Sequence, residues 1–564
     1  MEMQVKKILS EQFGYSEFRQ GQEAAVSAVL AQRDALVVMP TGAGKSLCYQ
    51  LPALALPGLT IVVSPLIALM QDQVSVLVAR NIPATFINST LSTNESVARL
   101  AAARSGEIKL LYVAPERFYD QAFMRGLQEV TVSLFAVDEA HCISEWGHDF
   151  RPSYLRLKDV LQTLHRPPVL ALTATATPDV RRDIIASLDL KDPAVIVTGF
   201  DRPNVTYGAI RATPTEKIEH AVRLVREISG PAIIYAGTRD AVDTMREVLA
   251  VNDISVTAYH AGIDKADREV SQQQFMEGKT RVMVATNAFG LGIDKPDVRL
   301  IVHMDLPGTL EAYYQEAGRA GRDGKPSYAV LLHHPSDRYL REFFLEGENP
   351  SPAFIRAVYG SLVRQIGDVI KTTYAEILAA TGMKAPEMAV STALKALEHA
   401  GYIERPRESA SAAGVQLLQP LAEVDAAINR RARVQRAVWE ALRDRYGKAL
   451  EVGVRFSPEE IVRSADFSRE GLSRSLKALT ERGLLAYAPP YRGQEIKILN
   501  RVMPEALALR WELLREKRRH DEQKLNLMEG YAHAVACRRA FILRYLGDTV
   551  ANERCFGCDN CGAR

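Results

Sequence analysis

A glycine-rich segment early in the chain has the residue types that bind nucleotide phosphates. It reads MPTGAGKS from Met39 to Ser46 and lies between an apolar run and a helical pattern, the context of a phosphate-binding loop. Its backbone N–H groups are expected to face phosphate oxygens, with Lys45 on the β- and γ-phosphates and the Ser46 hydroxyl on Mg²⁺. The strict pattern has glycine at Met39, so a glycine-rich turn without a ligand is the alternative. The predicted ATP-binding residues here are Thr41, Gly42, Ala43, Gly44, Lys45 and Ser46.

Two adjacent carboxylates in the segment VDEAH, from Val137 to His141, follow another apolar run. Because the run predicts a buried strand, Asp138 is expected at the strand's end, where a carboxylate holds the water shell of Mg²⁺. Glu139 is expected to position or polarise the water that attacks the terminal phosphate. Carboxylates in an ordinary loop are the alternative. With the phosphate-binding segment upstream, we predict that Asp138 and Glu139 are catalytic and that Asp138 and Ser46 are ligands of Mg²⁺.

Two arginines in a later segment are candidates for neutralising charge on the terminal phosphate. The segment YYQEAGRAGRDG runs from Tyr313 to Gly324, and its Arg319 and Arg322 would share one face of a helical turn. Guanidinium groups placed across a cleft between domains stabilise the transition state, an effect of about 10³–10⁵ in rate. Two surface arginines at a helix end are the alternative. Gln315 of the same segment is included as a candidate catalytic residue.

Four of the six cysteines are crowded at the end of the sequence. Two overlapping CxxC units and one cysteine a helix away fit tetrahedral Zn²⁺ held by four thiolates. Four buried free thiols are the alternative. The predicted zinc ligands are Cys537, Cys555, Cys558 and Cys561.

Short β-branched runs separated by helix-length segments are expected to position the nucleotide residues. Such runs predict βα units around buried parallel sheets. They divide near the turn-rich segment Gly199–Asn204, which suits a linker between two α/β domains in tandem. The predicted strands are Ala35–Met39, Thr60–Ser64, Leu110–Val113, Leu134–Val137, Val169–Leu172, Ala232–Tyr235, Arg281–Ala285, Leu300–His303 and Tyr328–Leu332.

After Pro335 the pattern becomes helical. Two segments, Tyr374–Arg405 and Phe456–Leu499, each predict helices followed by a glycine and a short strand, as in winged-helix units that repeat. Between them Glu408–Pro420 is rich in Ser, Ala and Gly and predicts a loop or wing tip. Arg510–Leu527 predicts a charged helix that leads to the cysteines.

Composition fits an ordinary globular protein with 47% hydrophobic and 24% charged residues, and the net charge is only +2. The charge is uneven, because residues 351–510 hold 24 Lys and Arg against 18 Asp and Glu. This basic segment suits an accessory DNA-binding module, although a solvated helical face is the alternative. The chain shows neither a secretory signal nor an apolar run long enough for a membrane span, so we expect a cytoplasmic location, on the nucleoid if the source is bacterial.

These motifs together resemble the RecQ helicases of superfamily 2, nearly continuously over residues 10–335. Similar motifs include SPLIALMQDQ, LTATAT and ATNAFGLGIDKPDVR, and the cysteine cluster resembles the zinc-binding subdomain of that family. In FGYSEFRQGQ, the resemblance implies that Tyr15 stacks on adenine and that Arg19 and Gln22 contact the nucleotide. CISEWGHDFRPSY resembles the family's aromatic-rich loop. There the implied DNA contacts are Trp146, His148, Phe150 and Arg151, with core aromatics as the alternative at Trp146 and Phe150.

The resemblance implies two tandem RecA-like parallel-sheet domains, followed by helical winged-helix-like units and a small zinc-binding helical subdomain. We expect domains at residues 1–200, 201–345, 346–420, 421–505 and 506–564. The order departs from the family's usual one, because the zinc-binding subdomain follows the winged-helix-like units. This departure puts a strand-separating hairpin in doubt. Tyr491 and Arg492 are candidates for its tip, and a plain wing turn is the alternative.

The implied function is an ATP-dependent DNA helicase that moves 3′ to 5′ in DNA repair, replication or recombination. Its expected cofactors are ATP, Mg²⁺ and Zn²⁺, its substrates single-stranded and tailed duplex DNA, and its state a monomer. One alternative is a translocase or RNA helicase with the same ATP-binding domains. Another is a winged-helix regulator with a vestigial ATPase, against which the intact Lys45, Asp138, Glu139, Arg319 and Arg322 argue.

Overall fold

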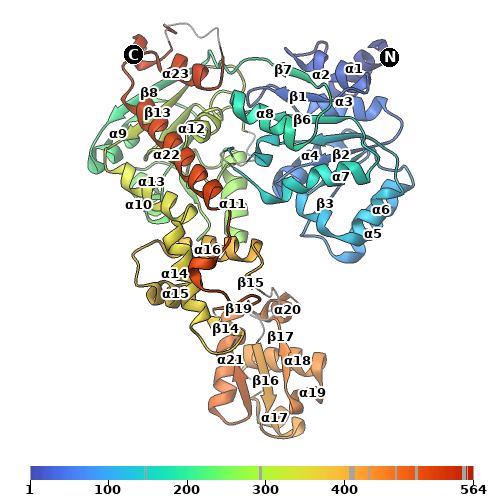
Figure 1. Ribbon diagram of the computed structural model, residues 1–564, viewed down its shortest axis with the longest axis vertical. Helices are drawn as coiled ribbons and strands as arrows, with labels where there is room; N and C mark the ends of the chain where they lie inside the picture. Colours follow the sequence, from blue (N-terminus) through green and yellow to red (C-terminus); the bar gives the residue numbers. More distant parts are fainter. Residues whose placement is uncertain are drawn as a thin grey trace. The chain divides into compact units, whose positions relative to one another are not determined.

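The computed structural model describes residues 2–144, 146–147, 149–290, 295–405, 413–429, 432–463, 467–489, 493–548, 554–555 and 557–562. The chain divides into two compact units. The sheet unit comprises Met1–Arg341 and Arg519–Arg564, and the insert unit comprises Glu342–Arg518. Figure 1 labels many of the elements of both. Among the described residues, no helix is both long and apolar enough to cross a membrane.

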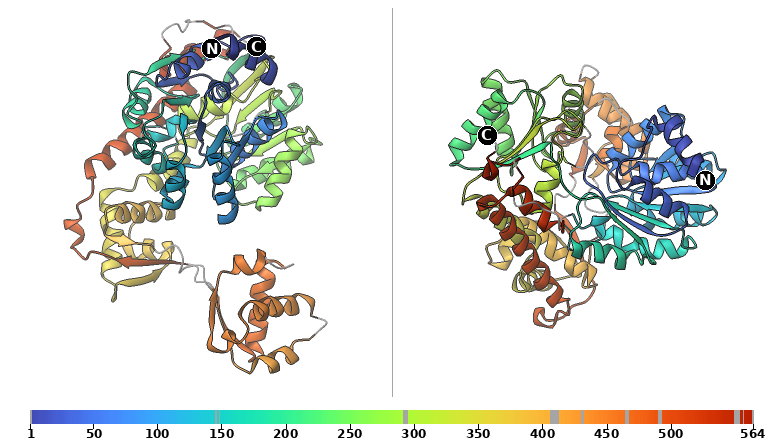
Figure 2. Two further views of the ribbon diagram at one scale, coloured as in Figure 1. Left: turned by 90° about the vertical axis from the view of Figure 1, so that its right-hand side faces the viewer. Right: turned by 90° about the horizontal axis from the view of Figure 1, so that it is seen from above.

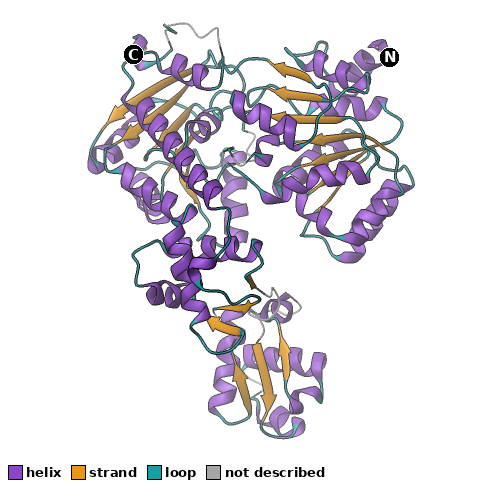
Figure 3. Ribbon diagram, viewed as in Figure 1, coloured by secondary structure: helices purple, strands orange, loops and turns teal. Residues whose placement is uncertain are grey.

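The first sheet of the sheet unit has seven parallel strands in the order β3-β4-β2-β5-β6-β1-β7. Helices connect consecutive strands and lie on both of its faces (Figure 3). The strands are β1 Ala35–Val38, β2 Leu59–Val63, β3 Ala84–Ile87, β4 Leu110–Val113, β5 Val132–Val137, β6 Val169–Thr173 and β7 Ala194–Val197. The helices are α1 Glu2–Phe13, α2 Gln22–Leu30, α3 Leu47–Ala55, α4 Ile67–Ala79, α5 Thr93–Arg104, α6 Gln121–Gln128, α7 Leu157–Thr163 and α8 Pro178–Ser187.

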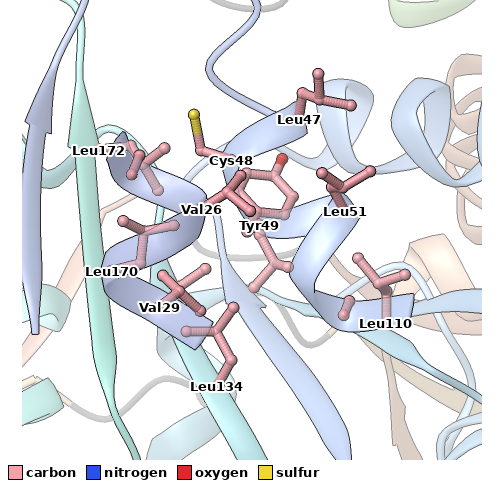
Figure 4. Packing of buried hydrophobic residues seen from close by; sticks show 14 of the residues in the cluster. Val26, Val29, Leu47, Cys48, Tyr49, Leu51, Leu110, Leu134, Leu170 and Leu172 are labelled. Atoms are coloured by element: carbon pink, nitrogen blue, oxygen red, sulfur yellow. The ribbon is translucent and has the colours of Figure 1, made fainter. Parts of the chain in front are cut away.

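A single apolar core joins this sheet to the helices that flank the phosphate-binding segment. Val26 and Val29 of α2 face Leu170 and Leu172 of β6, and Tyr49 of α3 lies between the helices and the sheet (Figure 4). All five side chains are almost fully buried. Because burial of this kind stabilises by about 25 cal/mol per Å² of apolar surface, the core holds β1 and α3 in place at both ends of the loop between them.

The second sheet has six parallel strands in the order β10-β11-β9-β12-β13-β8. Its strands are β8 Val205–Arg211, β9 Ala232–Tyr235, β10 Val256–Tyr259, β11 Val282–Ala285, β12 Leu300–His303 and β13 Ser327–His333. Its helices are α9 Pro214–Glu227, α10 Arg239–Val251, α11 Lys265–Met276, α12 Leu310–Ala317 and α13 Asp337–Glu348. The predicted α/β fold of two tandem parallel-sheet domains is confirmed, and β7 and β8 flank the predicted linker. Sequence reasoning missed β3, β7, β8 and β10.

The C-terminal end of the chain returns to the second sheet. It contains α22 Trp511–His533 and α23 Arg538–Tyr545, and the red C-terminal segment lies beside the green strands of this sheet (Figure 2). Tyr207 of the edge strand β8 forms a β-bridge with Cys558, and its N–H donates to Gly557 O at 3.1 Å. The cysteine-rich end therefore covers an edge strand that would otherwise expose unpaired backbone groups.

The insert unit contains two small three-stranded sheets, each with its own helices and core. The first sheet consists of β14 Val369–Thr372, β15 Ile403–Glu404 and β19 Gln494–Ile498, with α14 Pro352–Val363, α15 Tyr374–Thr381 and α16 Glu387–His399. The second consists of β16 Ala413–Leu417, β17 Val454–Phe456 and β18 Leu485–Ala488, with α17 Leu421–Ala427, α18 Arg433–Tyr446, α19 Ala449–Val452, α20 Pro458–Arg463 and α21 Arg469–Glu481. The insert unit also contains the short 3₁₀ helix η4 Pro504–Ala506, and the sheet unit contains the 3₁₀ helices η1 Pro115–Tyr119, η2 Ala140–Ile143, η3 Pro152–Arg156 and η5 Asp559–Cys561.

The strand pairings show that the insert unit consists of two subdomains, one nested within the other and not consecutive in the sequence. β19 was expected in the second unit, 421–505, but it pairs with β14 and β15 of the first. β16 was expected in the first unit, 346–420, within the predicted loop Glu408–Pro420, but it is a strand and pairs with β17 and β18. We call residues 413–488 the inner subdomain and the rest of the insert unit the outer subdomain. The inner subdomain is inserted between β15 and β19, two adjacent antiparallel strands of the outer subdomain.

Candidate nucleotide site and zinc centre

The phosphate-binding segment is the loop between β1 and α3, and Ser46 is the N-cap residue of α3. Gly42 and Gly44 adopt φ angles of 84° and 81°, which favour glycine. A Cβ at Gly44 would lie 2.6 Å from Gln22 Nε2. The Lys45 ammonium donates to Met39 O at 3.2 Å, inside the loop's own curve. These features fit a loop that presents N–H groups to phosphate oxygens.

A cavity of about 190 Å³ opens beside this loop. Tyr15, Arg19, Gln22 and Ser46 are among its lining residues, and Tyr15 is 45% exposed. The Gln22 amide donates to Ala43 O and Gly44 O, both at 3.1 Å, while Arg19 donates to Gly42 O at 2.8 Å. The residues that the family resemblance implied for adenine and for the nucleotide therefore line one cavity, next to the phosphate loop.

The carboxylate pair lies directly after β5, and the phosphate loop lies directly after β1, so both lie at the carboxyl ends of the parallel strands. Glu139 adopts a left-handed φ of 48°, and His141 Nδ1 lies 3.2 Å from Glu139 Oε2 and 2.9 Å from Thr173 Oγ1. Burial, and then the negative charge of Glu139, raise the pKa of Asp138 to about 7. Burial likewise lowers the pKa of the Lys45 ammonium, although Glu139 and Asp138 oppose this shift.

This arrangement fits a divalent cation. Burial, together with the repulsion between two neighbouring carboxylates, disfavours the charged form of Asp138 and raises its pKa. A cation between the Ser46 hydroxyl and the Asp138 carboxylate would remove that repulsion, and oxygen donors are the ligands Mg²⁺ prefers. The donor set predicted from sequence is therefore chemically suitable.

The arginine segment of the second sheet lies against the phosphate loop of the first. A Cβ at Gly42 would lie 3.4 Å from Arg322 Cγ, and one at Gly318 would lie 2.7 Å from Thr41 Oγ1. Arg319 and Gln315 are buried, at 4% and 8% exposure. Both arginines follow the end of α12 in a run of turns that we call the arginine turn, residues 318–322.

Sequence reasoning missed Arg202, which joins these two segments. Its buried guanidinium donates to Gly318 O at 2.9 Å, Ala320 O at 2.8 Å and Gly321 O at 3.1 Å, and to Thr41 O at 3.4 Å. It comes from GFDRPN, which was interpreted only as a linker. An arginine in a turn-rich segment does not reveal that its partners are carbonyls from both domains.

The aromatic-rich segment lies after the carboxylate pair. The Trp146 ring packs edge-on against the His520 ring of α22 at 5.0 Å, and Phe150 is half-buried. Arg151 donates to Pro65 O at 2.9 Å and forms an ion pair with Asp149. Trp146 and Phe150 are thus neither core residues nor fully exposed. His148, like Tyr491 and Arg492, lies outside the described residues.

The four predicted zinc ligands converge. The Sγ atoms of Cys537, Cys555, Cys558 and Cys561 all lie within 4.8 Å of one another. Tetrahedral Zn²⁺ binds thiolates at about 2.3 Å, which requires sulfur atoms this close together. Arg538 and Arg539, directly after Cys537, form ion pairs with Asp559 and Asp201 at 2.6 Å and 2.7 Å. The centre therefore fits zinc and is joined to the linker between the two sheets.

Family models match three segments of the chain. The DEAD/DEAH box helicase model covers residues 19–184, the helicase conserved C-terminal domain model covers 216–324, and the RecQ zinc-binding model covers 494–562. The first two correspond to the two sheets, and the third contains the four cysteines.

Curated relatives are similar over about 60% of the chain. The chain is 45% identical over 344 residues to an ATP-dependent DNA helicase RecQ of Pasteurella multocida, covering 60% of this chain and 54% of that relative. It is 42% identical over 348 residues to a probable ATP-dependent DNA helicase RecS of Bacillus subtilis, covering 61% of this chain and 70% of that relative. The chain thus spans 54% of the length of the first relative and 70% of the second.

Two solved structures share the fold at low sequence identity. One is Saccharomyces cerevisiae Dbp5 bound to RNA and ADP BeF3, with a TM-score of 0.50, 18% identity, and coverage of 61% of this chain and 90% of that one. The other is the DUF1998 helicase MrfA bound to DNA, with a TM-score of 0.50, 19% identity, and coverage of 72% and 61%. At these identities the likeness establishes the arrangement of elements alone.

Proposed function

This chain belongs to the RecQ family of helicases, and on that premise we propose that it is an ATP-dependent DNA helicase. It hydrolyses ATP, moves 3′ to 5′ along single-stranded DNA and separates duplexes. One observation carries the proposal: the arginine turn of the second sheet lies against the phosphate loop of the first. A triphosphate in that loop is contacted from both domains, so its hydrolysis changes how the domains are held together.

In the proposed mechanism, the cavity at Tyr15 holds adenine, with the Tyr15 ring on its face and the Gln22 amide on its edge. The Lys45 ammonium leaves Met39 O for the β- and γ-phosphate oxygens. Ser46 and Asp138 would hold Mg²⁺, which would supply charge neutralisation at the phosphates.

The Glu139 carboxylate accepts a hydrogen bond from the attacking water and orients it, and the His141 ring beside it fixes the carboxylate. Arg319 and Arg322 then stabilise charge on the terminal phosphate as it is transferred. Gln315, one turn before Arg319 on α12, is proposed to position the arginine turn.

Trp146, Phe150 and Arg151 are proposed to contact single-stranded DNA, because half-buried aromatic rings beside an arginine suit base stacking and phosphate binding. The four cysteines would hold Zn²⁺, which would keep the C-terminal end on the edge of the second sheet. Both halves of the nucleotide site come from one chain, so a monomer suffices for hydrolysis.

The test is a gel assay of strand separation on a duplex with a 3′ single-stranded tail, with ATP and Mg²⁺. The proposal expects product with this substrate and little with a 5′ tail, with an all-RNA duplex, or without ATP. Unwinding of RNA alone would replace the DNA helicase by an RNA helicase. ATP hydrolysis stimulated by DNA without any strand separation would leave a translocase.

A further inference from the structure

Lys524 of α22 is a buried lysine that contacts two segments distant in sequence. Its ammonium donates a hydrogen bond to Trp146 O and lies 3.5 Å from Glu311 Oε1 of α12. The Lys524 and Glu311 side chains are only 4% and 3% exposed. A buried ammonium is costly unless it is paired, so its carbonyl and carboxylate partners together fix its position.

One face of α22 contacts both segments. His520, Lys524 and Tyr531 are spaced four and seven residues apart, which places them on one face of the helix. The His520 ring packs against the Trp146 ring, and the Tyr531 hydroxyl lies 3.0 Å from the Tyr313 hydroxyl of α12. The helix therefore contacts the aromatic-rich segment of the first domain and α12 of the second.

α12 leads from this contact to the arginine turn. Glu311 lies in its first turn, Gln315 one turn later, and Arg319 directly after its end. At 1.5 Å per residue, about 12 Å of continuous helix and turn separates Glu311 from Arg319. Glu311 and the arginine turn are therefore connected through one continuous helix, along which a shift of Glu311 would be transmitted.

We propose that Lys524 is a positioning residue that couples DNA at the aromatic-rich segment to the arginine turn at the nucleotide. The inference rests on the proposed function. DNA that engages the Trp146 ring displaces the ring from His520 and moves the Trp146 carbonyl. Because the buried ammonium keeps its counter-charge, Lys524 and Glu311 move together, and α12 carries Arg319 and Arg322 into place. Lys524 touches neither nucleotide nor DNA.

The test compares ATP hydrolysis with and without a poly-dT oligonucleotide in the full-length protein. In Lys524→Met, hydrolysis without DNA persists and oligonucleotide binding is retained. The stimulation ratio, which is the rate with DNA divided by the rate without it, falls at least about fivefold, the lower range of coupling between sites.

Lys217→Met is the matched control. Lys217 is equally buried, pairs with Asp337 at 2.7 Å and donates to a carbonyl, Met304 O, at 2.8 Å, but it contacts neither Trp146 nor α12 in the described structure. This variant loses stability in the same way and keeps the stimulation ratio. The double variant Lys524→Met/Glu311→Leu removes both buried charges, so its melting temperature recovers while its stimulation ratio stays low.

Three outcomes decide the question. A normal stimulation ratio in Lys524→Met overturns the coupling role. A ratio restored in the double variant along with stability also overturns it, since the pair is then only structural. If the unaltered protein shows no stimulation by DNA at all, the proposed function itself fails, which the other two results do not imply.

Discussion

Lys45 lies in the curve of the phosphate loop, and its ammonium is bonded to the loop's own Met39 carbonyl. Lys45→Ala removes the cation expected on the β- and γ-phosphates, so we expect ATP hydrolysis to fall at least about a hundredfold. Binding of single-stranded DNA, measured by fluorescence anisotropy, should persist. Turnover close to that of the unaltered protein would reject the assignment of the nucleotide site.

Arg202 is the residue whose role emerges only in three dimensions. Lysine at this position keeps the charge but not the planar set of donors that reaches four carbonyls. We expect Arg202→Lys to lower kcat about ten- to hundredfold, because the arginine turn is misplaced, while KM for ATP changes little. Arg211→Lys, at an exposed position at the end of β8, is the control. Equal kcat values for the two variants would remove the positioning role.

Cys558 tests the zinc centre at the level of one side chain. It is fully buried and forms the bridge to β8, so Cys558→Ala should release zinc and lower the melting temperature. Cys48→Ala, a buried cysteine outside the cluster, should keep its zinc. Metal content by atomic emission distinguishes the two, and full zinc occupancy in Cys558→Ala would exclude it as a ligand.

At the level of elements, α22 packs on β13 through two histidines. The rings of His333 and His533 lie 5.0 Å apart. Burial, and then the neighbouring His533 and Lys217, lower the pKa of His333 to about 4. The unfolded chain therefore binds a proton at His333 between about pH 6.5 and pH 4 that the folded chain does not, so stability falls as the pH falls through this range.

His333→Gln lacks this titration and should lose less melting temperature than the unaltered protein between pH 7.5 and pH 5. Comparing the two proteins at each pH cancels effects that they share, such as loss of zinc. If the melting temperatures of the two proteins changed by the same amount across this pH range, the buried, neutral state of His333 would be contradicted.

The elements that sequence reasoning identified are those with a local signal. The predicted strands of the two parallel sheets were short apolar runs, and each of them overlaps an observed strand to within one residue at its ends or lies inside it. The missed strands β3, β7, β8 and β10 lie at or beside sheet edges, where side chains are only partly buried and the apolar pattern is weaker. The phosphate loop and the cysteine cluster were found because their spacing alone determines their chemistry.

Contacts between distant segments had no such signal. The strand Gln494–Ile498 follows a helix and a glycine, as the strand of a local wing would, yet it pairs with strands about a hundred residues upstream. Arg202 and Lys524 were also beyond prediction, because their partners are mostly backbone carbonyls that any residue could supply.

At the scale of the whole molecule, the nesting predicts that the inner subdomain can be deleted without unfolding the rest of the protein. Its ends enter and leave through adjacent strands, with Glu404 paired to Lys497. Replacing residues 406–493 by a Gly/Ser connection of about four residues closes a hairpin of ordinary length. We expect a folded protein that keeps zinc and ATP hydrolysis, since none of the candidate nucleotide or zinc residues is removed.

The same deletion shows whether the inner subdomain acts in strand separation. The measurement is the unwinding rate of the 3′-tailed duplex by the deletion variant and by the unaltered protein. Complete loss of ATP hydrolysis or of a cooperative melting transition would contradict the prediction that the sheet unit folds and works without the inner subdomain.

The return of the chain to the sheet unit at Arg519 has a consequence for biosynthesis. The ribosome finishes Glu311 long before it reaches Lys524, because the insert unit must be made in between. At about 5–20 residues per second, that interval is roughly ten to forty seconds. During this interval the Glu311 carboxylate of the nascent protein lacks its counter-ion Lys524, and the edge strand β8 lacks the C-terminal segment that covers it. A polypeptide released during this interval would carry the phosphate loop and the arginine turn without α22, the helix proposed to couple them to DNA.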